Sequence, residues 1–360
     1  MVDSSLNAGV SAQTGFALQR NTALYLLLEN YADKFKNKDY FICLEHHEDF
    51  LFCFINENNE AEIIEAYQSK KKSPNSWTLD DSLYQIIKKL LKTGKELWKD
   101  TFPKSSTYKH ILYFSTNQTT NLVIKEKRKV VDSVSIKEDN QIASFELLPK
   151  KIQDKISEGI ADDILKDELS RFKFLWVDLN RTVEKQENEL VGQLDKVFGN
   201  SINNKRAAVK AIIELFREIE EKYNQGNKAK LLDKSKRVNS YQIEETFKII
   251  TSRSKCFEFW HKQSREVSIA LKIKPSERNE FEFAFEASFD FFKSLQEAEH
   301  RKILEFVSLN ITKCQTYTDE DNVAELIRMF NDVETSPLGE IELKAVFFAA
   351  FFEVTFKGQN

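Results

Sequence analysis

The chain has 360 residues, and 53 Lys and Arg residues against 57 Asp and Glu residues give a formal net charge of −4. This balance excludes a protein that is basic throughout, so any surface that binds nucleic acid must be local. The low counts of nine Gly and five Pro exclude a collagen-like or Gly/Pro-rich disordered chain and indicate long regular elements. The length predicts two domains rather than one.

The sequence predicts a soluble, cytoplasmic protein. Its first ten residues, MVDSSLNAGV, lack the basic segment and apolar core of a secretory signal. The longest late apolar run, Ala345 to Phe351, is far shorter than the ~20 residues that a membrane-spanning helix needs. Four widely separated Cys residues show no C-x-x-C spacing, which fits a reducing compartment.

The first predicted element is an apolar helix from about Thr14 to Phe35, and strand-like residues begin at Phe41. Phe50 to Ile55 and Ala61 to Ser69 are rich in β-branched and aromatic residues. The turn-forming segment Asn56 to Glu60 separates these two runs. This pattern predicts a β-hairpin.

The hairpin brings polar side chains together at one of its ends. If Asn58 and Asn59 are the central turn residues, the numbers of paired residues sum to 117, and Asp49 lies opposite Gln68. Because side chains alternate along a strand, Gln68 and Lys70 project from the same face. A carboxylate, an amide and an amine therefore converge.

These groups need partners or a ligand, because an unpaired Lys or Asp in an apolar setting is costly. Oxygen atoms of Glu45, Asp49 and Gln68 suit Mg²⁺, or Mn²⁺ in its place, and such a metal shares a phosphate oxygen with its substrate. Lys70 would hold the attacking water or offset negative charge on the phosphorus. The predicted catalytic residues are Glu45, Asp49, Gln68 and Lys70.

An acid at the start of the second strand and an (E/Q)-x-K sequence on the third resemble the active site of PD-(D/E)xK nucleases. In this chain the positions are Asp49 and Gln68-Ser69-Lys70. The commonest pattern has a second acid where Gln68 stands, and the loss of that anionic ligand makes Glu45 more important. The resemblance implies a restriction-endonuclease-like mixed sheet and metal-dependent cleavage of DNA.

Residues in front of the hairpin narrow the resemblance. The sequence Gly15-Phe16-Ala17-Leu18-Gln19 leads into the apolar segment Ala23 to Glu29, and Trp77 follows the Gln68-Ser69-Lys70 motif. Over about residues 11 to 125 the chain resembles the nuclease domain of bacterial anti-phage effectors, found in CBASS endonucleases and in the nuclease subunit of Lamassu systems. The resemblance implies that Gln19 lies on a helix behind the active site and either reaches it or bridges groups within the core.

Thr78 and Asp81 indicate the start of a helix that runs to about Trp98. Four lysines fall within a narrow arc beside its apolar face: Lys88, Lys92, Lys95 and Lys99. A solvated surface stripe is one interpretation of this spacing. The other is a ridge that binds DNA phosphates together with Lys71 and Lys72.

Later segments are less specific. Lys109 to Thr116 predicts a fourth strand, and the basic run Lys125 to Lys129 is interpreted as a solvated loop or a helix end. Rising charge over Lys150 to Asp163 predicts a linker. From about Ile164, apolar residues at helical spacing predict helices almost to the end, although Phe281 to Phe285 is compatible with a helix or a strand.

The predicted architecture is an α/β nuclease domain over residues 1–150, a mixed sheet flanked by helices, and a mainly α-helical regulatory or oligomerisation domain over residues 151–360. We expect a Mg²⁺-dependent endonuclease of double-stranded DNA from a defence operon, with a Lamassu-like effector and its SMC-like ATPase partner favoured over a CBASS-like one. The resemblance implies a homo-oligomer when active and an inactive chain until a signal or partner arrives. The alternative is a non-catalytic DNA-binding or scaffold subunit, which Gln68 in place of an acid favours.

Overall fold

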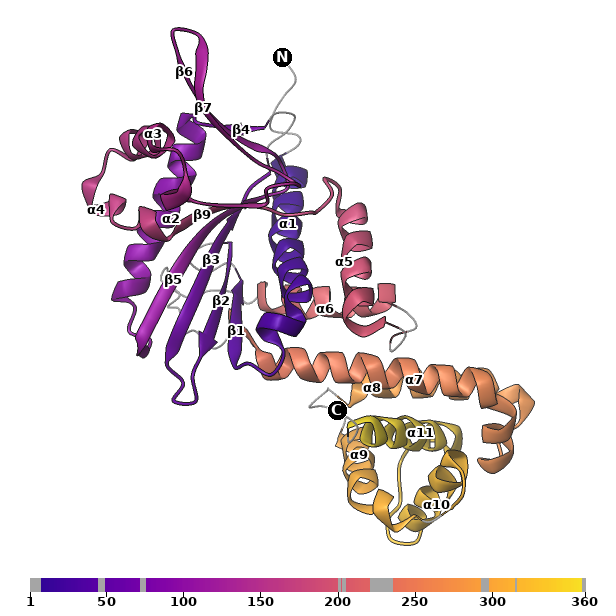
Figure 1. The fold of residues 1–360 in the computed structure, drawn as a ribbon. Helices are drawn as coiled ribbons and strands as arrows, with labels where there is room; N and C mark the ends of the chain where they lie inside the picture. The colour runs from indigo at the N-terminus through magenta and orange to yellow at the C-terminus, as the bar shows by residue number, and fades with distance from the viewer. Residues whose placement is uncertain are drawn as a thin grey trace. The chain divides into compact units, whose positions relative to one another are not determined.

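The computed structural model describes residues 8–44, 49–71, 76–199, 202, 205–220, 236–292, 298–314 and 316–357. The predicted fold class is confirmed, because a mixed sheet with flanking helices is followed by a helical region (Figure 1). The chain forms two compact units, and each is described by itself. The first comprises Met1–Val197 and Arg206–Ile243, and the second comprises Phe198–Lys205 and Glu244–Asn360.

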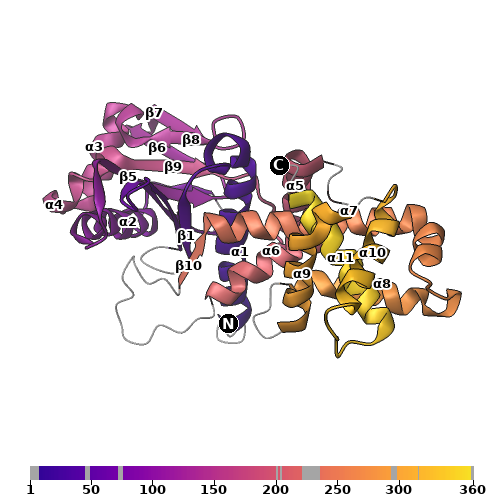
Figure 2. The ribbon, with the colours of Figure 1, turned by 90° about the horizontal axis from the view of Figure 1, so that it is seen from below.

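A seven-stranded sheet forms the centre of the first unit. Its strands, in order across the sheet, are β10 (Arg237–Asn239), β1 (Tyr40–Leu44), β2 (Phe50–Ile55), β3 (Ala61–Ser69), β5 (Lys104–Thr116), β9 (Phe172–Trp176) and β8 (Ile142–Ser144). Strands β3, β5 and β9 are parallel and the other neighbours are antiparallel. The carboxyl ends of the three parallel strands therefore share one edge of the sheet. Strand β10 comes from a distant part of the sequence and lies beside β1 (Figure 2).

The predicted hairpin and its register are confirmed. From Phe50↔Tyr67 to Phe54↔Ile63, paired residue numbers sum to 117. The predicted turn was wrong, because the N–H of Asn59 donates to the carbonyl of Asn56 (2.9 Å), which centres the turn one residue earlier. Asn59 then adopts a left-handed conformation with φ of 58°, and a register shift at the next pairs restores the expected pairing.

The helices of the first unit are α1 (Ala8–Glu29), the π-helical turn η1 (Tyr31–Phe35), α2 (Asp81–Lys99), α3 (Lys150–Ile160), α4 (Asp163–Lys166), α5 (Val183–Phe198) and α6 (Lys205–Glu220). The predicted first helix thus consists of α1 and η1. The start of α2 differs slightly from prediction, because its N-cap is Asp80, whose carboxylate accepts a hydrogen bond from the N–H of Leu83 (3.0 Å).

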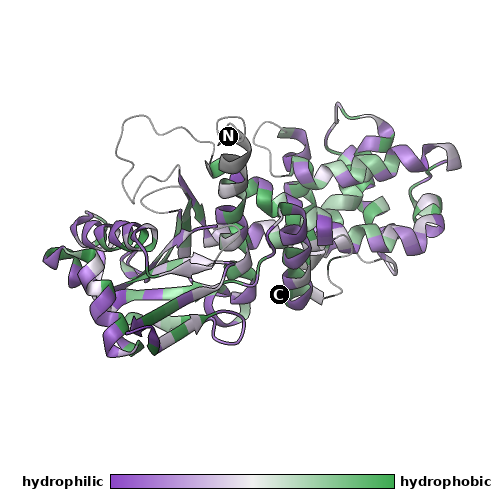
Figure 3. Ribbon diagram, turned by 90° about the horizontal axis from the view of Figure 1, so that it is seen from above, coloured by the Kyte–Doolittle hydropathy of each residue, from purple (hydrophilic) through white to green (hydrophobic). Residues whose placement is uncertain are grey.

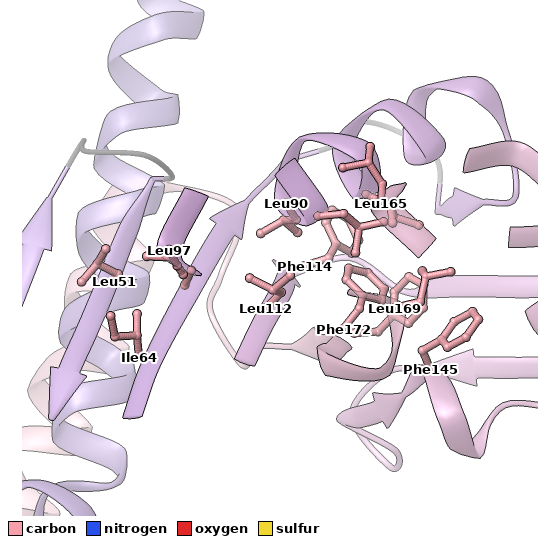
Figure 4. Close-up of a cluster of buried hydrophobic side chains, with 14 of the residues drawn as sticks. Leu51, Ile64, Leu90, Leu97, Leu112, Phe114, Phe145, Leu165, Leu169 and Phe172 are labelled. Carbon is pink, nitrogen blue, oxygen red and sulfur yellow. The ribbon is translucent and has the colours of Figure 1, made fainter. Parts of the chain in front are cut away.

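Alternate residues of the central strands face different helices. Toward η1, the rings of Phe35 and Phe52 lie 5.0 Å apart, and Lys34 pairs with Glu65. Glu65 also accepts a hydrogen bond from the hydroxyl of Tyr67 (2.9 Å). On the other face, buried strand residues pack on helices α2 and α3. Figure 4 shows labelled members of this cluster: Leu51, Ile64, Leu112 and Phe114 from strands, with Leu90 and Leu97 from α2.

A buried polar cluster holds α2 against the middle of β5. The imidazole of His110 and the carboxylate of Glu168 lie 2.7 Å apart, and both side chains are almost completely buried. Burial opposes ionisation of Glu168, but the hydrogen bond from His110, with the charges of Arg171 and Lys95, holds the pKa of Glu168 below its usual value. Gly94 of α2 permits the close packing, since an added Cβ would lie 2.9 Å from the Glu168 carboxylate.

The predicted boundary at residue 150 falls inside the first unit. Residues 150–160 form α3 rather than a linker, and three of its side chains enter the core: Ile152, Ile156 and Ile160. The sequence also predicted helices from Ile164 onward, whereas β9 and β10 complete the sheet beyond that point. The predicted boundary was wrong because the many charged residues on the exposed side of α3 made this segment resemble a linker, although its other side carries an apolar stripe.

A second sheet in the same unit contains β4 (Trp77–Thr78), β6 (Thr120–Glu126) and β7 (Lys129–Ile136). The basic run at residues 125–129 was interpreted as a solvated loop or a helix end. It instead forms the ends of β6 and β7 and the two-residue turn Lys127-Arg128 between them. In Figure 1 this hairpin extends away from the main sheet as a long two-stranded arm.

The second unit is helical and contains the rest of α7 (Ser240–Ala270), with α8 (Arg278–Phe291), α9 (Ala298–Asn310), α10 (Asp319–Asn331) and α11 (Glu340–Lys357). Phe281 to Phe285 is helical within α8. Residues Ala345 to Phe352 of α11 are buried in a core rich in Phe. Figure 3 shows hydrophobic residues along the strands and inner helices and hydrophilic residues on outer helices. Within the described ranges, every helix is too short or too polar to cross a membrane.

Candidate active site

Asp49 lies immediately before β2, at the sheet edge where β3, β5 and β9 end. Only 7% of it is exposed, and its Oδ2 accepts a hydrogen bond from the backbone N–H of Ser69 (2.7 Å). The Nζ of Lys70 lies 3.4 Å from both carboxylate oxygens. The predicted convergence of Asp49 and Lys70 is therefore present in the structure.

Gln68 is completely buried beside this pair, and the oxygen and nitrogen of its amide differ in their hydrogen bonding. Its Oε1 accepts a hydrogen bond from the Nζ of Lys89 on α2 (2.7 Å). Its Nε2 has no hydrogen-bond partner among the residues that the structure describes. A buried amide N–H without an acceptor is costly, so a ligand oxygen or a residue outside the described ranges would stabilise this atom.

Lys89 is the functional residue that the sequence argument missed. The spacing of lysines along the helix identifies Lys88, Lys92, Lys95 and Lys99, and Lys89 falls outside that series. A usable signal was present, because the helix between two parallel strands covers one sheet face, and Gln68 projects from a strand toward a helix. Lys89 lies next to the buried residue Leu90 on α2. Its long side chain extends beside the apolar stripe of the helix and reaches Gln68 near the end of β3.

The electrostatics of the site are dominated by burial of one carboxylate. Burial raises the pKa of Asp49, and the charges of Lys70 and Lys89 and the N–H of Ser69 oppose that rise. Among the described residues, two lysines face one carboxylate, and this balance of charge suits a phosphate group.

The structure does not test three of the predicted site residues. Glu45 and Lys72 lie outside the described residues. Gln19 is half-buried on α1, which lies toward the η1 side of the sheet, whereas Gln68 and Lys70 project toward α2. The role of Gln19 stays a prediction.

The predicted lysine ridge is heterogeneous in the structure. Lys71, Lys92 and Lys99 are exposed, and Lys88 is half-buried. Lys95 is engaged within the unit, because its Nζ lies 3.2 Å from Asp167 and 3.7 Å from Glu168. Any contact of this ridge with DNA phosphates would therefore depend mainly on the other lysines.

The donors at the site fit a hard divalent cation, since Asp49 and Gln68 offer carboxylate and amide oxygens. The Gln68 oxygen would first have to exchange its hydrogen bond with Lys89 for the metal. Within the described part of the chain, no group of three or more His, Cys, Asp or Glu side chains is placed to hold a metal. A second acidic ligand would therefore come from outside these residues, where Glu45 lies.

Neighbouring residues fix the strand ends that carry the site. The hydroxyls of Ser69 and Ser115 lie 2.6 Å apart and connect β3 to β5. The indole N–H of Trp77 donates to the hydroxyl of Thr116 (3.2 Å), and the Trp77 ring packs edge-on against Phe114. These buried contacts hold Gln68 and Lys70 in a defined position.

The site contains a buried acid, an amide and two lysines at the carboxyl ends of the central strands. This arrangement suits phosphodiester cleavage, so the class of protein is a nuclease. Residues 7–223 match the family model of the Cap4 dsDNA endonuclease domain. This match covers more than half of the chain, and the chain belongs to that family. No curated protein and no solved structure matches. The protein is thus a DNA endonuclease of anti-phage defence.

We expect Lys89→Met to lower kcat for DNA cleavage by about tenfold to a hundredfold, equivalent to about 1.4–2.7 kcal/mol. The change removes a positive charge beside Asp49 and the donor that fixes the Gln68 amide. Single-turnover cleavage of a labelled duplex measures the effect. Lys38→Met, at an exposed lysine before β1, is the matched control, and equal losses in both variants would show that Lys89 acts only as general surface charge.

Proposed function

We propose that the chain cuts double-stranded DNA in a Mg²⁺-dependent reaction at Asp49, Gln68 and Lys70. The observation that supports this most directly is the approach of Lys70 Nζ to both oxygens of a buried carboxylate, next to a buried amide. Such a group stabilises folding poorly and suits a reaction that develops negative charge on a phosphate.

Each residue has a distinct role in the proposed reaction. Asp49 and the Gln68 carbonyl would hold the cation, which when bound supplies charge neutralisation at the phosphate and a more acidic water. Lys70 is about one-third exposed, with 34% of its side chain accessible, and donates to a phosphate oxygen or to the attacking water. Lys89 orients the Gln68 amide and adds positive charge to the site.

The proposed biological setting is a CBASS-type system. The family model is that of Cap4, which supports a CBASS-type effector nuclease, and the Lamassu-like assignment favoured by the sequence lacks comparable support. We propose that the nuclease stays inactive until a signal or a partner subunit triggers assembly. A nucleotide cyclase gene beside this one would support CBASS, and a gene for an SMC-like ATPase would support Lamassu.

A non-catalytic DNA-binding or scaffold subunit is the competing proposal, and Gln68 in place of an acid is its best support. Purified full-length protein incubated with supercoiled plasmid distinguishes the two. Cleavage in Mg²⁺ that is lost in EDTA and restored by Mg²⁺ or Mn²⁺ supports the endonuclease. Intact plasmid in both metals, with and without the products of the neighbouring genes, would favour the scaffold.

Assembly is the proposed route to cutting both strands, because one site of this kind cuts one strand. The second unit has an apolar hollow of about 480 Å³ on α8, lined in part by Phe283, Ala284, Ala287 and Phe291. The Phe283 side chain is 80% exposed there. An exposed aromatic residue in an apolar hollow is typical of an interface, and a second copy of the chain is the proposed occupant.

We expect Phe283→Ser to leave folding unchanged but to weaken self-association of the active protein by about tenfold or more. Double-strand cuts should then be replaced by nicks, because paired sites separate. Light scattering and plasmid cleavage measure the two effects. Leu147→Ser, at a residue of the first unit that is 85% exposed, is the matched control. Unchanged mass and unchanged double-strand cutting in Phe283→Ser would remove this hollow as the interface.

A further inference from the structure

The arm formed by β6 and β7 carries unpaired positive charge at its tip. Lys125, Lys127, Arg128 and Lys129 are exposed, and no hydrogen bond or ion pair joins their side chains to other described residues. The acid within this run, Glu126, is neutralised by Lys151 of α3 (2.8 Å). Four cations therefore project from a chain whose formal net charge is −4.

The two residues of the turn adopt an unfavourable backbone conformation. Lys127 and Arg128 have φ of 46° and 66°, and the pairing of Glu126 with Lys129 makes them the two central residues of a type I′ turn. Asn-Gly is the favoured sequence for such a turn, because both positions require positive φ. The chain thus places two long cationic side chains where smaller residues would stabilise the hairpin, which points to a function for their charge.

The arm begins beside the active site. Thr120, at the base of β6, pairs with Trp77, whose indole contacts Thr116 at the end of β5. Thr116 directly follows Ser115, the residue that contacts Ser69 between Gln68 and Lys70. Seven residues of β6 at ~3.3 Å per residue place the tip roughly 20 Å from this base.

We propose that the β6–β7 arm enters the major groove of the DNA duplex and contacts its phosphates through Lys127 and Arg128. A two-stranded ribbon fits a major groove that is ~12 Å wide, whereas the minor groove of ~6 Å is too narrow. The reach of the arm places the contact roughly half a helical turn from the cleaved phosphate. Recognition is independent of base identity, because phosphates carry none. This inference rests on the proposed DNA cleavage and adds a positioning surface to it.

The test is the double variant Lys127→Asn with Arg128→Gly. We expect this variant to be more stable than wild type but to bind DNA more weakly. Asn-Gly should raise the midpoint of thermal unfolding by about 2–4 °C, because it suits the turn. Affinity of the full chain for a labelled duplex in EDTA should fall about tenfold at moderate salt. The slope of log K against log salt should become shallower by up to ~1.8, or ~0.9 per lost phosphate contact.

The matched control is Lys36→Asn with Lys38→Asn, at exposed residues before β1, which removes the same charge at the opposite edge of the sheet. Chemical methylation of guanine N7 gives a second readout, since N7 lies in the major groove. Wild type and control should protect guanine N7 of the bound duplex, and the arm variant should not. Equal affinity and salt slope in arm variant and control, or no N7 protection by wild type, would overturn the inference. If the wild-type protein showed no Mg²⁺-dependent cleavage, the proposed reaction would be overturned. The inference about the arm would still be tested, because binding is measured in EDTA, where no DNA is cut.

Discussion

Asp49→Asn should abolish DNA cleavage while the protein stays folded. Asparagine keeps the shape of the side chain and an oxygen that can accept the hydrogen bond from Ser69 N–H, but it loses the negative charge that faces Lys70. A loss of at least a thousandfold in rate, about 4 kcal/mol of transition-state stabilisation, is a reasonable demand on such a group. Initial cleavage rates with Mg²⁺ in excess measure it.

Lys70→Ala should have an effect of the same order, because Lys70 is the cation closest to the carboxylate and reaches solvent. Thermal unfolding should change little in either variant, since the site contributes little net stability. Lys38→Ala, at an exposed residue at the far edge of the sheet, is the control for a lost lysine. Full cleavage by purified Lys70→Ala would exclude this site as the catalytic centre.

Gly94→Ala should destabilise the first unit by about 2–4 kcal/mol, although alanine ordinarily favours a helix over glycine. A Cβ at this position would lie 2.9 Å from the Glu168 carboxylate, 3.0 Å from Leu112 and 3.1 Å from the His110 imidazole. These side chains are buried, so relief of the clash breaks the hydrogen bond between His110 and Glu168. Urea unfolding followed by circular dichroism measures the change.

The matched control is Gly192→Ala on α5, where an added Cβ meets nothing within 4 Å. This variant should be more stable than wild type by about 0.5–1 kcal/mol, through helix propensity alone. If both alanine variants shift stability in the same direction, close packing at Gly94 does not govern the outcome.

The same cluster sets a pH dependence of stability. The pKa of Glu168 is lowered in the folded protein, so the stability it contributes is present above the ordinary Glu value and is lost as pH falls through the lowered value. Glu168→Gln removes this contribution at every pH. Its deficit in unfolding free energy relative to wild type should therefore be largest near pH 7 and should shrink below about pH 4.

The hairpin shows what could be predicted from the sequence and why. The register around Asp49 and Gln68 was predicted from a turn centred on Asn58 and Asn59, because the two strands are buried on both faces and show no clear alternation that would fix their pairing. The turn itself was misplaced, since the left-handed Asn59 and the neighbouring register shift compensate for each other. The predicted register was therefore correct although the predicted turn was wrong.

Contacts between distant segments were not predicted from the sequence. Lys89 reaches Gln68 only because α2 packs across the face of β3, and His110 meets Glu168 from 58 residues away. Strand β10 has three residues and no apolar alternation that would identify it. In each case the partner is chosen by packing of whole elements, which local patterns do not encode.

Strand β10 has a consequence for the time at which the nuclease becomes complete during synthesis. It pairs with β1 through Phe41↔Asn239 and Ile42↔Val238, across about 200 residues. At 5–20 residues per second, a ribosome needs roughly 10–40 s to add them. Until then β1 is an open sheet edge of apolar residues, a template for pairing with other chains. The matched range ends at residue 223, so a fragment cut there would keep that edge open permanently, whereas one that extends to residue 243 would close it.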